Sequence, residues 1–453
     1  MANERIPGRE PDRARSVLES PLSATWSPRV RERVVLVGVA PGIAEADIEE
    51  LAALADSAGA EPVARLVQSR PPDPATYVGK GKVEEVRRLV QATQASAVIL
   101  DHELTPGQLR SLEERLDVKV VDRTALILDI FALHARSREG KAQVELAQLN
   151  YLLPRLRGWG EAMSRLGAGI GTRGPGETKM EVDRQHIRRR ISKLRRDIKD
   201  LARTRDVKRA SRQRSGLPQI AIAGYTNAGK STLMNALTSA DVLVADQVFA
   251  TLDPTTRRLE LPGGRHATIS DTVGFVGKLP HDLVEAFRST LEEVTRSDLI
   301  LHVADASSPA LPEQIEAVRS VLAEIGAGGI PELLVLNKID RVLGSARAGA
   351  ARRFPGSIQV SGRTGEGVEG VLRAAAAALP HPPVEVTLLV PFGREDVTAR
   401  LYREAEVLDA EAEEGGTIVR ARVNARELAA VRDLVLTEPA DRAEERPARA
   451  PRP

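Results

Sequence analysis

The sequence predicts a multidomain α/β protein, and three observations support this prediction. At 453 residues the chain is too long for a single ordinary hydrophobic core, so two to four domains are expected. Short runs of β-branched residues alternate with amphipathic segments of helical length in two regions, residues 33–137 and 219–379. This alternation is typical of βαβ units built on a parallel sheet. A long stretch with helical periodicity separates the two regions.

The composition narrows the class of protein. The 65 Lys and Arg residues nearly balance the 63 Asp and Glu residues, so a basic surface that attracts a partner must be local. The chain contains no cysteine, which excludes disulfides, thiolate metal sites and thiol nucleophiles, and any metal is expected to have oxygen ligands. A signal peptide and a membrane span are not expected, because no apolar run reaches the necessary length. We therefore expect a cytoplasmic protein, and we expect it to be a monomer.

The two ends of the chain are charged, proline-rich and non-periodic, which is typical of disordered tails. The composition changes several times between them. The predicted order is a disordered tail (1–31), an N-terminal parallel α/β domain (32–137), a helical arm with a glycine-rich loop (138–216), a second α/β domain (217–380), a small C-terminal α/β domain (381–437) and a disordered tail (438–453).

The arm is predicted from a helix-like segment, "AQVELAQLNYLLPRLRG", followed by the glycine-rich stretch "GAGIGTRGPGETKMEVD" and a long basic segment. Apolar residues recur in the last part at spacings of seven, four, three, four and three, which predicts the a/d seam of a helix. The expected geometry is an antiparallel pair of helices joined by a loop. The seam residues are Met180, Ile187, Ile191, Leu194, Ile198 and Leu201.

The second part of the arm carries an unusual charge. Between Arg184 and Arg214 there are 14 basic and three acidic residues, a net excess of 11 positive charges. Charge runs often form only the solvated face of a helix. This excess is larger than solubility requires and suits a phosphate backbone, so we expect RNA contact. Since no aromatic residues lie nearby, such contact would depend on charge and shape rather than on base stacking.

The segment "QIAIAGYTNAGKSTLMNAL" combines an apolar strand, a Gly-x-x-x-x-Gly-Lys-Ser loop and the start of a helix, which predicts a P-loop. Gly224 and Gly229 permit a backbone whose N–H groups face phosphate oxygens. Lys230 is expected to reach the β- and γ-phosphates, and Ser231 to offer its hydroxyl to Mg²⁺. The predicted phosphate-binding residues are Gly224, Tyr225, Thr226, Asn227, Ala228, Gly229, Lys230, Ser231 and Thr232.

Three further elements follow, each after a predicted strand. Asp271 begins an Asp-x-x-Gly motif in which the carboxylate is expected to hold Mg²⁺ and the Gly274 N–H to meet the γ-phosphate. In the stretch Asn337–Lys338–Ile339–Asp340, the Asp340 carboxylate can accept two hydrogen bonds from guanine N1 and N2, which adenine cannot supply. The last element, Ser361–Gly362–Arg363, is expected to bring its backbone near guanine O6.

Each element also has an ordinary structural interpretation. Asp271 could cap a helix, Asn337 and Asp340 could form turns, and Ser361 could be a simple loop residue. Four such elements in this order, each at the carboxyl end of a predicted strand, favour a common ligand site instead. We therefore predict a Ras-like P-loop GTPase domain that binds GTP or GDP with Mg²⁺.

The set of residues that would promote hydrolysis is less complete than the set that would bind the nucleotide. A switch threonine is needed to coordinate Mg²⁺; Thr251 is the first choice, with Thr255 and Thr256 as alternatives that spacing does not separate. Lys230, Thr251 and Gly274 are the predicted catalytic residues. The position after Gly274 carries Phe275, where Ras-like GTPases usually have a glutamine that orients the attacking water.

Together these residues resemble the HflX family of GTPases over about residues 33–435. The resemblance rests on "GYTNAGKST", "FATLDPTTR", "DTVGF" and above all on "RTALILDIFALHARSREGKAQVELAQLNYLLPRLRG" followed by "GTRGPGETKMEVDRQHI". It implies GTP binding, slow hydrolysis stimulated by ribosomes, association with the large ribosomal subunit and its rRNA, and splitting of stalled or hibernating ribosomes under stress. It also implies ATP binding by the N-terminal domain in some members, for which "YVGKGK" is the candidate segment here.

Two positions qualify the resemblance. Asn227 matches a position that resembles a K⁺ ligand in related GTPases, where the cation supplies charge that an arginine finger otherwise provides; the alternative is a loop amide that caps its own backbone. Gly362–Arg363 stands where Ala-Lys is usual. Because the contact there is largely through the backbone, guanine specificity should survive.

Two other functions compete with a ribosome-associated GTPase. One is a GTP-dependent RNA-binding factor for the assembly of ribosomal subunits, in which nucleotide turnover is incidental. The other is a metabolic or membrane-linked GTPase chaperone, which the basic arm and the absence of lipid signals disfavour. Sedimentation with mature or with precursor subunits distinguishes the first two.

Overall fold

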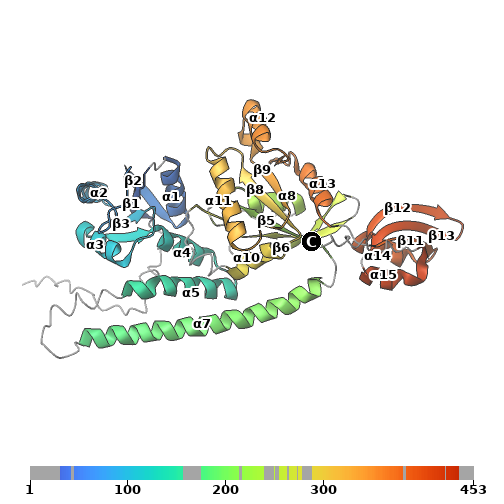
Figure 1. Ribbon diagram of the computed structural model, residues 1–453, viewed down its shortest axis with the longest axis horizontal. Helices are drawn as coiled ribbons and strands as arrows, with labels where there is room; N and C mark the ends of the chain where they lie inside the picture. Colours follow the sequence, from blue (N-terminus) through green and yellow to red (C-terminus); the bar gives the residue numbers. More distant parts are fainter. Residues whose placement is uncertain are drawn as a thin grey trace, which may run out of the picture. The chain divides into compact units, whose positions relative to one another are not determined.

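The structure is a computed structural model, and Figure 1 shows its helices and strands. The chain divides into two compact units. The first comprises residues 1–201, 247–249 and 278–287, and the second comprises residues 202–246, 250–277 and 288–453. The residues that the structure describes are 31–41, 45–156, 175–213, 217–238, 249, 255–262, 265–272, 274–277, 288–380, 384–423 and 425–437.

The N-terminal domain contains a four-stranded, all-parallel sheet in the order β2-β1-β3-β4. The strands β1 and β3 read as continuous apolar runs because their residues are buried. The elements are β1 (Glu32–Val39), α1 (Glu45–Ser57), β2 (Ala60–Gln68), α2 (Lys80–Thr93), β3 (Ala97–Leu100), α3 (Pro106–Leu116), β4 (Lys119–Asp122) and α4 (Arg123–His134). This architecture confirms the predicted parallel α/β domain.

The helix α4 is buried along most of its length, since every residue from Arg123 to Phe131 is shielded from solvent. Asp122 caps its start by accepting a hydrogen bond from the backbone N–H of Ala125 at 2.8 Å. Arg123 is buried in this apolar environment and ion-pairs with Asp101 at 2.5 Å, and it also pairs with Glu50. The two carboxylates compensate for the burial of the guanidinium charge.

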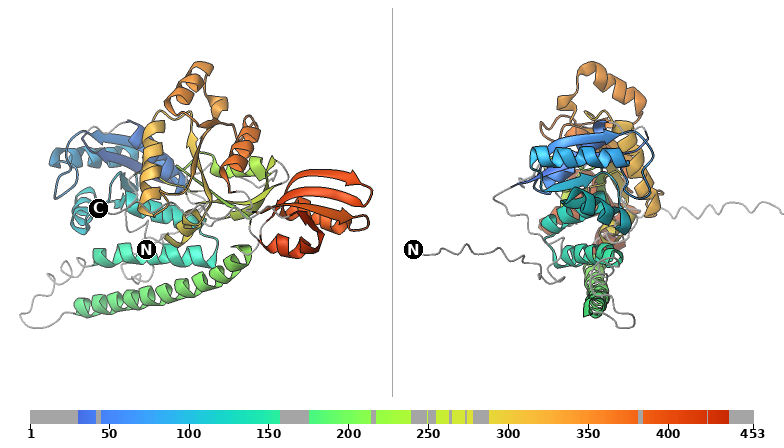
Figure 2. Two further views of the ribbon diagram at one scale, coloured as in Figure 1. Left: turned by 45° about the vertical axis from the view of Figure 1, so that its right-hand side comes forward. Right: turned by 90° about the vertical axis from the view of Figure 1, so that its left-hand side faces the viewer.

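The arm consists of α5 (Arg138–Arg155) and α7 (Pro175–Gln213), which run side by side and antiparallel (Figures 1 and 2). Arg190 of α7 donates two hydrogen bonds to the Glu145 carboxylate of α5, at 2.6 and 2.7 Å. The predicted seam residues Ile187, Ile191 and Leu194 are buried. The apolar spacing in the sequence therefore predicted the packed face of α7 correctly.

The start of α7 differs from the expectation. The sequence assigned residues 167–183 to a glycine-rich loop, but the helix already begins at Pro175. Proline is favoured in the first turn of a helix, because its missing N–H would have no intrahelical partner there. The residues Glu177–Met180 that follow have adequate helical propensity. Gly176, in the first turn, therefore did not prevent helix formation.

The second α/β domain contains a six-stranded sheet in the order β10-β9-β8-β5-β7-β6, in which only β6 is antiparallel. The parallel strands all end at one edge, where the predicted ligand motifs follow them. The elements are β5 (Gln219–Gly224), α8 (Lys230–Thr238), β6 (Thr255–Glu260), β7 (His266–Asp271), α10 (Arg288–Thr295), β8 (Leu299–Asp305), α11 (Leu311–Glu324), β9 (Glu332–Asn337), η3 (Ile339–Arg341), α12 (Gly344–Arg353), β10 (Ile358–Gln359) and α13 (Val368–Ala378).

The C-terminal domain is a small α/β unit, as the sequence predicted. Its four strands form an antiparallel sheet in the order β12-β13-β11-β14, and two helices supply apolar residues to the core. The elements are β11 (Val384–Pro391), α14 (Glu395–Glu404), β12 (Glu406–Glu413), β13 (Gly416–Val423), α15 (Ala425–Val431), η4 (Arg432–Leu434) and β14 (Val435–Thr437). Among the described residues, no helix is both long and apolar enough to cross a membrane.

The buried ion pair of Arg123 generates a stability prediction. Asp101→Ala leaves the buried guanidinium with one carboxylate fewer, so we expect the N-terminal domain to lose about 3 kcal/mol of unfolding free energy. Scanning calorimetry of the full chain should show its transition at least about 10 °C lower. Glu85→Ala, which breaks the exposed Lys82–Glu85 pair, is the matched control and should cost less than about 1 kcal/mol. Equal shifts for both variants would contradict the prediction.

Candidate nucleotide-binding site

The P-loop connects β5 to α8 and encloses the Lys230 side chain. Lys230 is buried, and its Nζ donates to the carbonyl oxygens of Gly224 at 3.1 Å and Tyr225 at 2.9 Å. Burial lowers the pKa of the ammonium to about 8; Asp271 opposes this shift and Lys338 reinforces it. The protein thus holds a cation where it has few favourable contacts with water, which suits an anionic ligand.

The residues after Asp271 lie directly on the P-loop. Phe275 donates its backbone N–H to Gly224 O at 3.1 Å, and its carbonyl accepts from the Thr226 N–H at 2.6 Å. A side chain at Gly274 would meet Thr226 Cγ2 at 2.8 Å and Lys230 Nζ at 3.0 Å. This close approach requires glycine at position 274 and brings it next to the lysine predicted to bind phosphate.

Phe275 itself is buried, with only 2% of its surface exposed. Its backbone forms an isolated parallel bridge with Tyr225, whose hydroxyl accepts a hydrogen bond from the Gly277 N–H at 2.5 Å. The aromatic side chain is therefore shielded from solvent, while its backbone links the two loops. It offers no group that could orient a water molecule.

Asn337 joins three loops. It is 2% exposed, its Nδ2 donates to Ala228 O at 2.8 Å, and its Oδ1 accepts from the Gly362 N–H at 3.0 Å. The P-loop, the end of β9 and the loop after β10 are thus fixed relative to one another by a single amide. Gly229 leaves room for it, because a Cβ there would lie 2.4 Å from Asn337 Nδ2.

Asp340 presents a carboxylate with two identified partners. Ser361 Oγ donates to Oδ1 at 2.7 Å, and Arg363 Nη2 donates to Oδ2 at 2.6 Å. The hydrogen bonds from Ser361 and Arg363 lower the pKa of Asp340, so the group is an anionic acceptor. Arg363 is exposed and presents planar N–H donors to this carboxylate, as the N1 and N2 edge of guanine would. Guanine and Arg363 would therefore compete for Asp340.

Lys338 and Asn227 lie near each other above the P-loop. Lys338 Nζ ion-pairs with Asp305 at 2.9 Å and is 3.5 Å from Asn227 Oδ1. Asn227 has a left-handed backbone conformation, with φ of 57°. Its side-chain oxygen thus already faces one cation. This contact is compatible with a K⁺ ligand and also with a simple loop amide.

Two oxygen donors are suitably placed for Mg²⁺. Ser231 Oγ donates to Asp271 Oδ2 at 2.6 Å, so the hydroxyl and the carboxylate predicted as metal ligands are adjacent. In the described part of the chain, no group of three His, Cys, Asp or Glu residues could hold a metal by itself. This donor set fits Mg²⁺, which usually takes one or two protein oxygens and completes its shell with phosphates and water.

The structure does not settle the choice of switch threonine, since Thr251 lies outside the described residues. The two alternatives begin β6. Both are exposed; Thr256 Oγ1 is hydrogen-bonded to Ser270 Oγ on β7 at 2.9 Å, and Thr255 pairs in register with Asp271. Thr256 therefore has a structural role that weakens its candidacy.

Sequence reasoning missed two features of these loops. One is that Asn337 links three loops. The sequence motif that contains it was interpreted only as an element that recognises the base. The other is Phe249, which is buried and lies edge-to-face with Phe131 of α4, with ring centroids 4.5 Å apart. Phe249 groups with the first compact unit although it precedes Thr251 by only two residues. A large aromatic residue in a polar switch segment is the signal that could have suggested such an anchor.

Comparison with known families covers most of the chain. The model described as "GTP-binding GTPase N-terminal" matches residues 45–132, and that described as "GTP-binding GTPase Middle Region" matches residues 134–212. The model described as "50S ribosome-binding GTPase" matches residues 219–338. The three matches follow the order of the N-terminal domain, the arm and the P-loop domain.

Individual proteins are also similar to this chain over most of its length. The chain is 46% identical over 411 residues to GTPase HflX of Caldanaerobacter subterraneus subsp. tengcongensis, which covers 90% of this chain and 95% of the relative. It is 44% identical over 377 residues to GTPase HflX of Escherichia coli, covering 82% and 88%. A GTP-binding protein from Sulfolobus solfataricus, solved with GDP, is 25% identical with a TM-score of 0.41 and covers 77% of this chain and 98% of its own. The chain belongs to the HflX family of GTP-binding GTPases.

Proposed function

We propose that this GTPase hydrolyses GTP slowly on its own, that the large ribosomal subunit stimulates it, and that it splits or rescues stalled or hibernating ribosomes in the cytoplasm under stress. The observation that carries the proposal is Phe275, whose buried ring and loop-to-loop hydrogen bonds leave the usual water-orienting position without a polar side chain. A GTPase built in this way would need K⁺, a partner, or both for hydrolysis.

The residues of the site have distinct roles in this reaction. The P-loop backbone and Lys230 would bind the β- and γ-phosphates, and the Gly274 N–H would contact the γ-phosphate. Ser231 and Asp271 would hold Mg²⁺, which when bound neutralises charge on the phosphate oxygens. Since burial lowers the pKa of Lys230 to about 8, the anionic phosphates would favour its charged form. Thr251 is proposed to close over the nucleotide.

The partner is inferred from the arm. The exposed side of α7 carries arginines that project away from its seam, including Arg188, Arg189 and Arg195. Such a surface suits the phosphate backbone of rRNA. The ribosome-binding description of the family model that matches residues 219–338 supports the large subunit as the source of that RNA. An assembly role is the outcome to expect if the protein sediments with precursor subunits rather than mature ones.

The first prediction concerns base choice. Asp340→Asn removes the acceptor for guanine N1 and N2, so we expect GTP affinity to fall at least about 100-fold while xanthosine triphosphate binds better than it does to the wild type. Arg363→Ala is the matched control. It removes the donor that competes for the same carboxylate, and GTP should then bind equally well or more tightly. Titration calorimetry with both nucleotides measures this, and unchanged GTP affinity in Asp340→Asn would refute the assignment.

The second prediction concerns the ion. If Asn227 Oδ1 helps to bind K⁺ at the phosphates, replacing K⁺ by Na⁺ at constant ionic strength should slow hydrolysis several-fold. Asn227→Ala should remove the difference between the salts, whereas Asn227→Asp, which keeps an oxygen ligand, should retain it. Phosphate release in the two salts provides the measurement. Equal wild-type rates would leave Asn227 as a loop amide.

The third prediction concerns the ribosome. Large subunits should raise the GTPase rate at least about tenfold, and replacing Arg188, Arg189 and Arg195 by glutamine should reduce this stimulation and the salt dependence of subunit binding. Each lost phosphate contact lowers the log–log salt slope by about 0.7 to 0.9. GTP affinity should not change, because none of the three arginines contributes to the P-loop site.

The matched control replaces three exposed arginines of α12 and α13, namely Arg352, Arg353 and Arg373, by glutamine. This variant carries the same change in net charge, so stimulation by large subunits should persist. If both triple variants lost stimulation equally, the effect would come from net charge alone. If neither lost it, the arm would not be the RNA-binding surface.

A further inference from the structure

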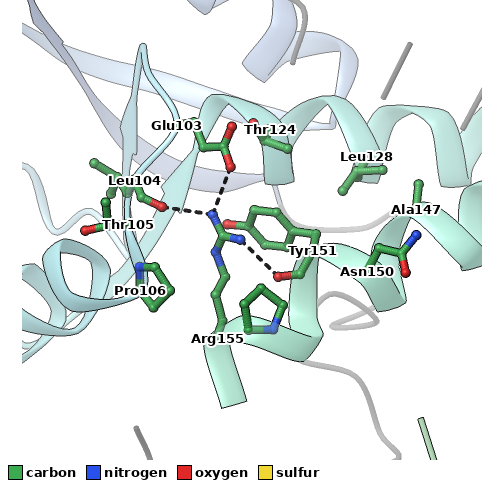
Figure 3. Close-up of a pocket in the computed structure, with 11 residues that line it drawn as sticks. Glu103, Leu104, Thr105, Pro106, Thr124, Leu128, Ala147, Asn150, Tyr151 and Arg155 are labelled. Carbon is green, nitrogen blue, oxygen red and sulfur yellow. Dashed lines mark hydrogen bonds and ion pairs between the residues drawn. The ribbon is translucent and has the colours of Figure 1, made fainter. Parts of the chain in front are cut away.

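The N-terminal domain and the arm helix α5 enclose a cavity that the nucleotide chemistry does not use (Figure 3). Its volume is about 410 Å³, which lies in the range of small-molecule sites. It opens beside the carboxyl ends of β3 and β4, the edge at which parallel sheets commonly bind ligands. The lining residues are Glu103, Leu104, Thr105, Pro106, Thr124, Leu128, Ala147, Asn150, Tyr151, Pro154 and Arg155.

Most of this wall is apolar. Leu104, Leu128 and Ala147 are buried residues of three different elements, and the Tyr151 ring is covered by the Arg155 guanidinium at 3.4 Å from the ring centroid. A wall with this composition is suited to the hydrocarbon part of a ligand, which gains free energy when it leaves water. The cavity therefore favours an occupant with an apolar body.

Two polar atoms at the wall, Thr124 Oγ1 and Arg155 Nε, have no hydrogen-bond partner among the residues that the structure describes. Thr124 is 4% exposed, and the side chain of Arg155 is 10% exposed. A buried polar group without a partner costs about 1–3 kcal/mol. The Thr124 hydroxyl can accept a hydrogen bond from an N–H of the occupant, whereas Arg155 Nε, itself a donor, cannot. The ligand is therefore expected to carry a hydrogen-bond donor near Thr124.

Glu103 and Arg155 are the charged residues of the lining, and Asp122 lies next to Arg155. Arg155 is the only cation among the lining residues, and its guanidinium is already engaged by Leu104 O at 2.8 Å, Asp122 at 3.3 Å and Glu103 at 3.4 Å. Two carboxylates thus face one guanidinium. Glu103 lies at the mouth with its side chain 50% exposed, where it could pair with a second cation. An anion would meet net repulsion here.

We propose that this cavity binds an amphipathic amine, a small molecule whose apolar body lies against Leu128 and Ala147 and whose ammonium pairs with Glu103. Phosphorylated ligands are the wrong class for it. The ATP that the family resemblance implies for the N-terminal domain would bring several negative charges to a site with no available cation. The segment Tyr77–Lys82, the candidate for that ATP, does not line the cavity.

The test compares three probes of similar size and different charge: phenethylamine, 2-phenylethanol and 3-phenylpropionate. Their binding is measured by saturation-transfer NMR and by titration on the full chain, with GDP and Mg²⁺ kept saturating. We expect phenethylamine to bind with a dissociation constant on the order of 1 mM. The alcohol should bind about threefold to tenfold more weakly, and the acid should not bind. ATP is included as the phosphorylated probe and should not compete with the amine.

Three variants locate the site. Glu103→Gln should weaken the amine to the level of the alcohol and leave the alcohol unchanged, which a merely structural defect would not do. Ala147→Leu adds volume inside the cavity and should abolish binding of both probes. Ala142→Leu, on the same helix but outside the cavity lining, is the control and should bind both normally.

Several results would overturn the proposal. The acid could bind as tightly as the amine, ATP could displace the amine, or Ala147→Leu could leave binding intact. Absence of binding by both the amine and the alcohol at about 20 mM, well above the affinity expected for such fragments, would also refute it. GTP affinity, measured in parallel, should be the same in all three variants, so failure here is independent of the proposed GTPase function.

Discussion

The nucleotide site depends on one buried side-chain amide. Asn337 donates to the P-loop carbonyl of Ala228 and accepts from the N–H of Gly362, and it can do both because its amide carries a donor and an acceptor. An aspartate would lose the donor and a leucine would lose both bonds. Because the amide is buried, a backbone group that lost its hydrogen bond to Asn337 could not form one with water instead. The relative positions of the P-loop, Asp340 and Ser361 follow from this contact.

The second constraint is the pairing of Phe275 with Tyr225. It adds one parallel bridge beyond the paired strands β5 and β7, so the loop that follows Asp271 starts from a fixed point. The bulky ring is shielded from solvent. The same residue that removes a water-positioning side chain therefore stabilises the loop arrangement. Gly274 complements it by allowing the backbone to approach Lys230.

Much of the architecture was predictable because the relevant patterns are local. The alternation of apolar strands and amphipathic helices predicted the parallel sheet of the N-terminal domain and the parallel strands of the second sheet, and the spacing of Ile187, Ile191 and Leu194 predicted the packed face of α7. The positions of Lys230, Asp271, Asn337 and Asp340 follow from motifs at strand ends. The start of α7 at Pro175 was missed, because glycine content was given more weight than the helical propensity of the residues that follow.

Other features could not be predicted because they depend on contacts between distant segments. The pairing of Arg363 with Asp340, the edge-to-face contact of Phe249 with Phe131 and the cavity beside Tyr151 each need the folded chain to bring residues together. From the sequence alone, for example, Arg155 would be expected to be an exposed basic residue. In the fold it lies over an aromatic ring and pairs with Asp122, a buried carboxylate.

The length of α7 has a mechanical consequence. At 1.5 Å per residue, its 39 residues extend about 58 Å, nearly twice the length of a helix that spans a small domain. A rotation of about 5° around one end would displace the other end by about 5 Å, the rise of one helical turn. The bidentate contact of Arg190 with Glu145 lies near the middle of the helix and ties it to α5 there. The helix thus has the dimensions of a lever that converts a small angular change into a movement on the scale of a nucleotide.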